Sequence, residues 1–300
     1  MTNASWIDLL DPTQDEIERA LPHALHAHTL ERLLAPAEHG DEPRPTLLGH
    51  GDYVFGVFLV AVAVPHEDTV FYQEVDLVLT GDAVVTVRKT PPGRPPFAPD
   101  LQGREPIASP ALVAYRLVDA VAEAYLDLTD ALEDEIDELE DNVDAWPGAR
   151  VRGRISALRH DLLHIRQTLA PTRDAVRRVV DGRVDVDGDG IFDRDAQLHF
   201  ADAYDKLLRA AEGIELARDL LGGVRDYHQS KVANDQNEVM KRLTVVASLL
   251  LLPTFIVGLY GQNFDDIPEL GWSWGYGWSW AVIGVTTLLQ LLYFRRKRWI

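Results

Sequence analysis

The chain of 300 residues contains no cysteine. This absence excludes a disulfide framework, a thiolate metal site and a cysteine nucleophile, and it fits a reducing compartment. Basic residues are also scarce, with 29 Lys and Arg against 48 Asp and Glu and a formal net charge of -19. Because nucleic-acid binding needs clustered Lys and Arg, the composition argues against a nucleic-acid partner and favours an acidic body that attracts cations.

The basic residues that are present gather at the two ends of an apolar C-terminal region. Residues 241–300 carry six basic and three acidic side chains, so all of the net negative charge lies in residues 1–240. Two uncharged runs, 243–260 and 278–294, approach the length of about 20 residues that crosses a bilayer as a helix. Five of the seven tryptophans lie at or beyond the ends of these runs, as in an interfacial aromatic belt. The sequence predicts two membrane spans rather than a buried soluble hairpin, since soluble helices are seldom apolar all round.

The charge pattern also predicts the orientation of these spans. The connecting loop, 261–277, has no Lys or Arg, whereas basic residues precede the first span and follow the second. The positive-inside rule therefore places the loop outside and both termini in the cytoplasm of a multi-pass protein of the plasma (cell inner) membrane. The first eleven residues lack a basic stretch followed by an apolar one, so we expect no cleavable signal peptide.

The region before the spans has the pattern of a mixed α/β head followed by long helices. We expect a helical segment over 5–35, starting at a capping box of Thr13 and Glu16, and then β-rich runs at 53–64, 70–80 and 83–89. A proline-rich linker at 91–100 follows, and helical periodicity covers 107–180, with breaks near 146–148 and at Pro171. The next helix begins at about residue 196 and continues into the first span. We predict three parts: a cytoplasmic α/β domain (1–100), long cytoplasmic helices including the stalk helix (101–240), and a transmembrane domain (241–300).

Four local patterns have structural interpretations that compete with functional ones. Residues 271–275 match the G-x-S-x-G nucleophile pattern, but no histidine follows them, which argues against a hydrolase. His160 and His164 have a spacing that can hold a metal, although exposed helical histidines are commoner. Residues 185–193 resemble a calcium loop, DxDGDGxxD, but the glutamate of an EF-hand is missing at Ala196. Nine carboxylates within 130–144 indicate mainly the solvated face of an amphipathic helix, and they could also attract divalent ions weakly.

Small, flexible or polar residues recur along the first span at alternating steps of three and four. They are Asn237, Met240, Thr244, Ala247, Leu251, Thr254, Gly258 and Gly261. This spacing places them on one stripe of the helix. The stripe fits ordinary helix packing through small residues, and it also fits the lining of a pore. One such helix cannot enclose a pore, so a pore implies several copies in a homo-oligomer with closed symmetry.

The segment Tyr260-Gly261-Gln262-Asn263-Phe264, followed by Ile-Pro-Glu-Leu at 267–270 and by the basic end at 293–300, resembles the CorA family of divalent-cation transporters. Segments 52–55, 169–173, 200–205 and 237–241 are also similar to strings of that family. The resemblance implies a funnel-shaped homopentamer whose first span lines the pore. It also implies a selectivity motif at Gly261, Gln262 and Asn263, and cytoplasmic metal-binding positions at Asp202 and Asp205.

Two positions depart from the family pattern. Gln262 replaces the methionine of the family motif, which the zinc-transporting ZntB branch also lacks. Arg32 stands where an acidic ligand of a cytoplasmic site is expected, so the family geometry implies that its guanidinium faces Asp202 of a neighbouring subunit. A permanent pair there would weaken the dependence of gating on cytoplasmic Mg²⁺.

The chemistry of the motif is compatible with Mg²⁺, which prefers oxygen ligands and dehydrates reluctantly. A ring of Asn263 amides, assisted by Gly261 carbonyls, would bind a hydrated ion without trapping it. Asp265, Asp266 and Glu269 in the loop would raise the local concentration of cations. The spans and their loop contain no His or Cys that would hold Zn²⁺.

These residues predict a divalent-cation channel and not an enzyme, with Mg²⁺ as the first candidate and Co²⁺ or Ni²⁺ as further ions. The expected partners are other copies of the chain, the lipid bilayer and the transported ions. We expect no resident cofactor, apart from Mg²⁺ or Ca²⁺ bound in the cytoplasmic domain. Two alternatives stay open: ZntB-like Zn²⁺ transport, with or without proton coupling, and a membrane-anchored ion sensor that does not conduct.

Overall fold

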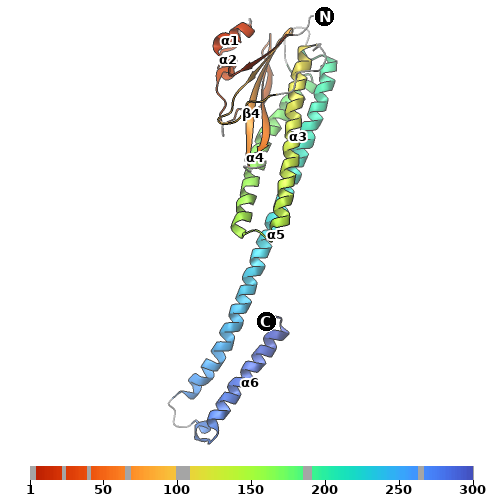
Figure 1. The fold of residues 1–300 in the computed structure, drawn as a ribbon. Helices are drawn as coiled ribbons and strands as arrows, with labels where there is room; N and C mark the ends of the chain where they lie inside the picture. The colour runs from red at the N-terminus through yellow and green to blue at the C-terminus, as the bar shows by residue number, and fades with distance from the viewer. Residues whose placement is uncertain are drawn as a thin grey trace. The chain divides into compact units, whose positions relative to one another are not determined.

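The structure is a computed structural model that describes residues 5–21, 25–38, 42–64, 69–98, 109–184, 191–262 and 267–299. The chain divides into two compact units, Met1–Arg225 and Asp226–Ile300 (Figure 1). The first unit contains a β-sheet and most of the helical residues. The second contains the C-terminal part of one helix and the whole of another, and both helices are long and apolar enough to cross a membrane.

A five-stranded sheet forms the centre of the first unit. Its strands are β1 (Ser5–Leu10), β2 (Thr46–Gly49), β3 (Val54–Val64), β4 (Thr69–Leu79) and β5 (Ala83–Arg88). Their order across the sheet is β1-β5-β4-β3-β2, with β1 parallel to β5 and the other neighbours antiparallel. The three predicted β-rich runs are confirmed as β3, β4 and β5, whereas β2 was not predicted.

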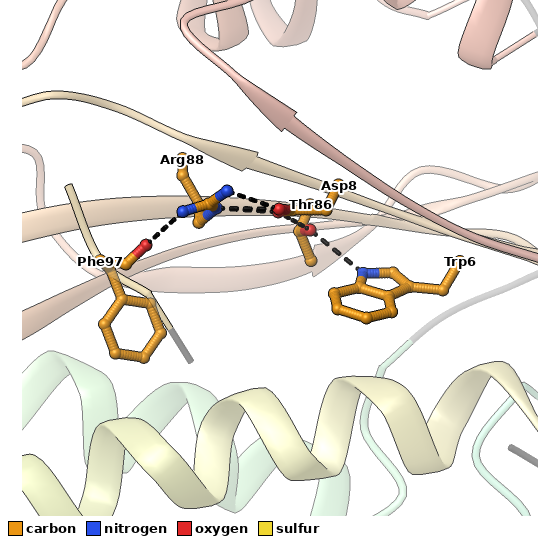
Figure 2. Close-up of polar contacts among 5 residues, drawn as sticks. All are labelled: Trp6, Asp8, Thr86, Arg88 and Phe97. Atoms are coloured by element: carbon orange, nitrogen blue, oxygen red, sulfur yellow. Dashed lines mark hydrogen bonds and ion pairs between the residues drawn. The ribbon is translucent and has the colours of Figure 1, made fainter. Parts of the chain in front are cut away.

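The predicted helix over 5–35 is wrong at its start, because residues 5–10 form a strand. Figure 2 shows what holds β1 beside β5: the Trp6 indole donates to the Thr86 hydroxyl at 3.2 Å, and Thr86 donates to Asp8 at 2.7 Å. The Arg88 guanidinium binds both carboxylate oxygens of Asp8 and donates to the Phe97 carbonyl at 2.7 Å. The partners of Trp6 and Asp8 lie about 80 positions away in the sequence, so a local pattern cannot predict them.

Helices cover both faces of the sheet. The short helices α1 (Gln14–Ala20) and α2 (Ala27–Leu34) pack against one face through Ile17, Leu21 and Leu33. The predicted capping box at the start of α1 is present. The larger core lies on the other face, where α3 (Pro110–Asn142) and α4 (Gly148–Val180) pack together with the first part of α5 (Arg194–Tyr260). The apolar positions of the acidic stretch, Leu132, Ile136, Leu139 and Val143, are all buried in this core.

The predicted helix break at Pro171 is also wrong, since α4 continues through that residue. Proline removes one backbone donor and typically costs about 3 kcal/mol inside a helix. Here the flanking side chains of Thr168, Leu169 and Thr172 are buried, and the Thr172 hydroxyl donates to the Thr168 carbonyl at 2.8 Å. Tertiary packing therefore holds the helix together across the proline. The predicted break near 146–148 is confirmed, because α3 ends at Asn142 and α4 begins at Gly148.

Helix α5 extends over 67 residues without interruption, as predicted from the scarcity of proline. Its start is capped by the Asp193 carboxylate, which accepts a hydrogen bond from the Ala196 amide at 2.8 Å. Gly213 lies on this helix where an added Cβ would collide with Thr129 of α3, so glycine is needed for close packing of the two helices. After α5, a 3₁₀ turn η1 (Pro268–Gly271) leads into α6 (Gly275–Arg296).

Candidate ion pathway and cation sites

The end of α5 and helix α6 form an antiparallel pair in the second unit (Figure 1). Val245 and Ile256 of α5 are buried, and the Gln290 amide of α6 donates to the Ser248 hydroxyl at 3.0 Å. Few other residues of the two apolar segments are buried within the chain. This exposure argues against the core of a soluble protein and fits helices that face lipid and other membrane helices.

The predicted pore stripe lies away from the face of α5 that packs on α6. Its members are all exposed in the single chain: Asn237, Met240, Thr244, Ala247, Leu251, Thr254, Gly258 and Gly261. The Thr244 and Thr254 hydroxyls donate to the carbonyls of Met240 and Leu250 at 2.8 and 2.7 Å. Since each hydroxyl has used its hydrogen, its remaining lone pairs can accept hydrogen bonds from the water shell of a cation.

The two glycines of this stripe differ in how much space the chain leaves for a side chain. An added Cβ at Gly261 would come within 3.2 Å of the Val257 carbonyl oxygen, whereas at Gly258 it would meet no atom within 4 Å. Packing inside the chain therefore does not explain the small residue at Gly258. Either a pore or a neighbouring membrane helix accounts for it.

The selectivity motif is only partly described. The amides of Gly261 and Gln262 donate to the carbonyls of Val257 and Leu259, which closes the end of α5. Asn263, Asp265 and Asp266 lie outside the described residues. Glu269 is half-buried in η1, where its carbonyl oxygen accepts from the Trp272 amide at 3.2 Å. The roles predicted for these residues stay predictions.

The residues that match G-x-S-x-G have a structural explanation. An added Cβ at Gly275 would collide with the backbone carbonyl of Glu269, so the tight entry into α6 requires glycine. The indoles of Trp272 and Trp274 stack with their centroids 5.0 Å apart, and both contact Trp278. This cluster lies at the loop end of the two apolar helices, where membrane proteins concentrate tryptophan.

In the first unit, the predicted metal position Asp202 lies near a lysine. The Lys206 ammonium is 2.5 Å from Asp119, 3.1 Å from Glu123 and 3.9 Å from Asp202. Burial lowers the pKa of Lys206, but the hydrogen bonds to Asp119 and Glu123 raise it more, so the pKa lies above its usual value. The lysine stays charged and occupies the place that a cation would take among these carboxylates. Local patterns in the sequence do not predict this pairing, because Asp119 and Glu123 belong to α3.

Asp205 is exposed on the same helix. Whether Asp202 and Asp205 bind a metal between subunits is a prediction that a single chain does not test.

Arg32 has a partner within its own chain. Its guanidinium donates to Glu74 of β4 at 2.6 Å, so Arg32 does not simply point into solvent. Its contact with Asp202 of a neighbouring subunit stays a prediction. The same glutamate accepts from Lys89 at 2.6 Å, and Lys89 also lies 2.9 Å from Asp76 and donates to the Arg32 carbonyl at 2.7 Å. Glu74, Asp76 and Lys89 are all buried. Burial raises the pKa of Asp76 to about 7, although Lys89 acts to lower it.

The remaining metal candidates are not brought together as sites. Among the described residues, no group of three or more His, Asp or Glu side chains is placed to hold a metal ion. His164 instead lies 3.1 Å from Glu42 and contacts the ring of Tyr72 edge-on. In the calcium-like loop, residues 185–190 lie outside the described residues, and Asp193 serves as the cap of α5.

The fold and the two apolar helices define a membrane protein with a large α/β head. A sequence model of the family described as CorA-like Mg²⁺ transporter protein matches residues 2–296. The chain therefore belongs to the CorA-like Mg²⁺ transporter family, a family of membrane transporters and not of enzymes.

Individual relatives agree with this assignment. The Bacillus subtilis protein YfjQ, named as a candidate metal ion transporter, is 30% identical over 98% of this chain and 89% of its own length. The cobalt/magnesium transport protein CorA of Thermotoga maritima is 36% identical over 62% of this chain, a match that covers 52% of that protein. This chain thus matches about half the length of the Thermotoga relative.

Solved structures confirm the fold class. The complete CorA magnesium transporter of Methanocaldococcus jannaschii aligns with a TM-score of 0.78, with 20% identity, over 98% of this chain and 91% of that one. The full-length CmaX protein aligns with a TM-score of 0.68 and 19% identity over 98% of this chain. At these identities the structures show a shared fold and leave the transported ion to other arguments.

Proposed function

We propose that this chain is a divalent-cation channel that prefers Mg²⁺, with Co²⁺ or Ni²⁺ as further ions. The observation that carries the proposal is the stripe of α5, which is left exposed by α6 and contains hydroxyl oxygens and small residues. Oxygen atoms that accept hydrogen bonds from the water shell of the ion suit Mg²⁺, because this ion keeps its waters. The name of the Thermotoga relative includes magnesium and cobalt, which supports the same ions.

The proposal includes assembly into a closed homo-oligomer, a pentamer by resemblance to the family. One exposed stripe cannot surround an ion, whereas symmetric copies of it can. Basic residues precede the first span and follow the second, whereas the loop 261–277 has none, so we propose a plasma-membrane protein with both termini in the cytoplasm.

Parallel flux measurements test the ion preference. Purified protein in liposomes is supplied with Mg²⁺ or Zn²⁺, with and without a pH gradient. Mg²⁺ flux that is independent of the gradient supports the proposal. Zn²⁺ flux accelerated by protons, without Mg²⁺ flux, would favour the ZntB-like alternative, and no flux of either ion would favour a sensor.

The exposed glycine of the stripe provides a steric test. We expect Gly258→Leu to reduce Mg²⁺ flux by at least about tenfold, because a bulky side chain on the stripe narrows a pore. The matched control is Gly284→Leu on α6, where an added Cβ likewise meets no atom within 4 Å. Equal flux in the two variants would remove Gly258 from the pore lining.

Because Lys206 neutralises the carboxylates near Asp202, we expect Mg²⁺ to have little effect on the unfolding temperature of the wild-type protein. We expect Lys206→Gln to acquire a Mg²⁺-dependent rise of the unfolding temperature that the wild type lacks, since the freed carboxylates repel one another and attract the ion. A gain of about 1 kcal/mol in binding corresponds to roughly 2–4 °C for a protein of this size. The control, Arg209→Gln, loses the same charge from an exposed position on the same helix. An identical Mg²⁺ response in wild type and Lys206→Gln would contradict the prediction.

A further inference from the structure

A polar cleft lies in the second unit, where the apolar helices end. It has a volume of about 390 Å³. Its lining comes from α5 and from the turn after α6: Asn234, Asn237, Glu238, Lys241, Arg298 and Trp299. The uncharged run of α5 starts two residues after Lys241, and α6 ends two residues before Arg298. The cleft therefore opens at the level where a bilayer surface meets the protein.

The charges in the cleft favour an anion. The Glu238 carboxylate pairs with Arg242 at 2.5 Å, so its negative charge is already compensated. Within the described part of the chain, no carboxylate lies within ion-pair distance of Lys241 or Arg298. The cleft thus presents two uncompensated cations, and the amides of Asn234 and Asn237 add neutral hydrogen-bond donors.

The backbone holds Arg298 and Trp299 against this cleft in a defined turn. The Trp299 amide donates to the Phe294 carbonyl at 3.0 Å, and the Arg298 amide donates to the Arg295 carbonyl at 3.1 Å. These are the two hydrogen bonds of a Schellman motif, and the Trp299 and Phe294 rings stack with their centroids 5.7 Å apart. Arg298 has a φ of 55°, the position where helices usually carry glycine. The chain therefore has a long cationic side chain at a position where the backbone conformation favours glycine.

We propose that this cleft binds the phosphate headgroup of an anionic phospholipid from the bilayer leaflet at the level of the cleft. A lipid fits better than a soluble phosphate, because the cleft lies where the apolar segments of α5 and α6 end, at the level of a bilayer surface. The Trp299 indole has the amphipathic character that membrane proteins use at headgroup level. Basic pockets between transmembrane helices are a known means of binding such headgroups. The site is independent of which cation the protein transports.

Native mass spectrometry of the detergent-purified full-length protein tests the site. Wild type is incubated with phosphatidylglycerol or with phosphatidylcholine, and the retained lipid is counted per chain. We expect retention of phosphatidylglycerol only, weakened about tenfold in Arg298→Gly and in Lys241→Gln through loss of charge-assisted hydrogen bonds. Glycine suits the φ of residue 298, so Arg298→Gly removes the cation while favouring the turn. Asn237 is left unchanged because it also belongs to the predicted pore stripe.

Lys297→Gln is the matched control, since it removes the same charge one residue away from the cleft lining. Its retention of phosphatidylglycerol is expected to equal that of wild type. Equal losses in Lys297→Gln and Arg298→Gly would show only general attraction to an anionic surface and would overturn the site. Retention of phosphatidylcholine at the same level would also overturn it. Displacement of phosphatidylglycerol by millimolar inorganic phosphate would reassign the cleft to a soluble anion.

Discussion

Purified Asn263→Ala protein is expected to stay oligomeric and to lose divalent-cation flux in liposomes by at least about tenfold. The proposed filter consists of one Asn263 amide from each subunit, and alanine removes that oxygen ring with little change of volume. Asn263→Asp would add a ring of negative charge, so it should bind ions more tightly and release them more slowly. Conduction needs binding that is favourable but weak, which both substitutions disturb in opposite directions.

Flux of Mg²⁺ into vesicles, measured beside size-exclusion chromatography of the same samples, checks this result. Asn142→Ala serves as the control, because its amide donates to the Glu138 carbonyl at the end of α3 in the head. Wild-type flux in an oligomeric Asn263→Ala protein would exclude the amide ring as the filter. Loss of the oligomer in that variant would instead show a role in assembly.

Lys89→Met is expected to destabilise the head by about 3–5 kcal/mol, the usual cost of removing one partner of a buried ion pair. Lys89 compensates Glu74 and Asp76, and all three side chains are almost completely buried. Methionine fills a similar volume but, among the described residues, leaves the two carboxylates with the Arg32 guanidinium as their one cationic partner, which contacts Glu74. Urea unfolding of the solubilised full-length protein, followed by circular dichroism, measures the difference.

The pH dependence of this loss distinguishes charge from packing. The pKa of Asp76 is raised by burial to about 7, above its unfolded value, so proton uptake by Asp76 stabilises the fold fully below about pH 4. That contribution is lost as the pH rises through about 7. A protonated Asp76 needs no counter-charge, and the deficit of Lys89→Met should therefore shrink as the pH falls. The added substitution Asp76→Asn should recover part of the lost stability at neutral pH.

Arg183→Met provides the surface comparison for Lys89→Met. Arg183 lies 3.7 Å from Asp181 with a largely exposed side chain, and such pairs contribute about 0–1 kcal/mol. A loss below about 1 kcal/mol in Lys89→Met, equal to that of Arg183→Met, would mean that water reaches the cluster and compensates the carboxylates.

The sequence by itself determined the features that depend on local requirements. A membrane helix must satisfy its own backbone hydrogen bonds and present apolar side chains all round, so the spans could be predicted from two uncharged runs. The same holds for the continuous helix α5 and for the buried face of the acidic stretch in α3, because helical periodicity is a short-range property. The family motif around Gly261 is also a contiguous string of residues.

Only the tertiary structure decided which distant residues meet. Strand β1 is stable because Asp8 and Trp6 find partners on β5, and α4 passes through Pro171 because buried neighbours support it. Lys206 pairs with Asp119 of another helix. Lys89 forms ion pairs with Glu74 and Asp76 and donates to the Arg32 carbonyl. In the polar pairings the partner is at least 13 positions away in the sequence. At Pro171 the supporting residues are close in sequence, but their burial is created only by the folded chain.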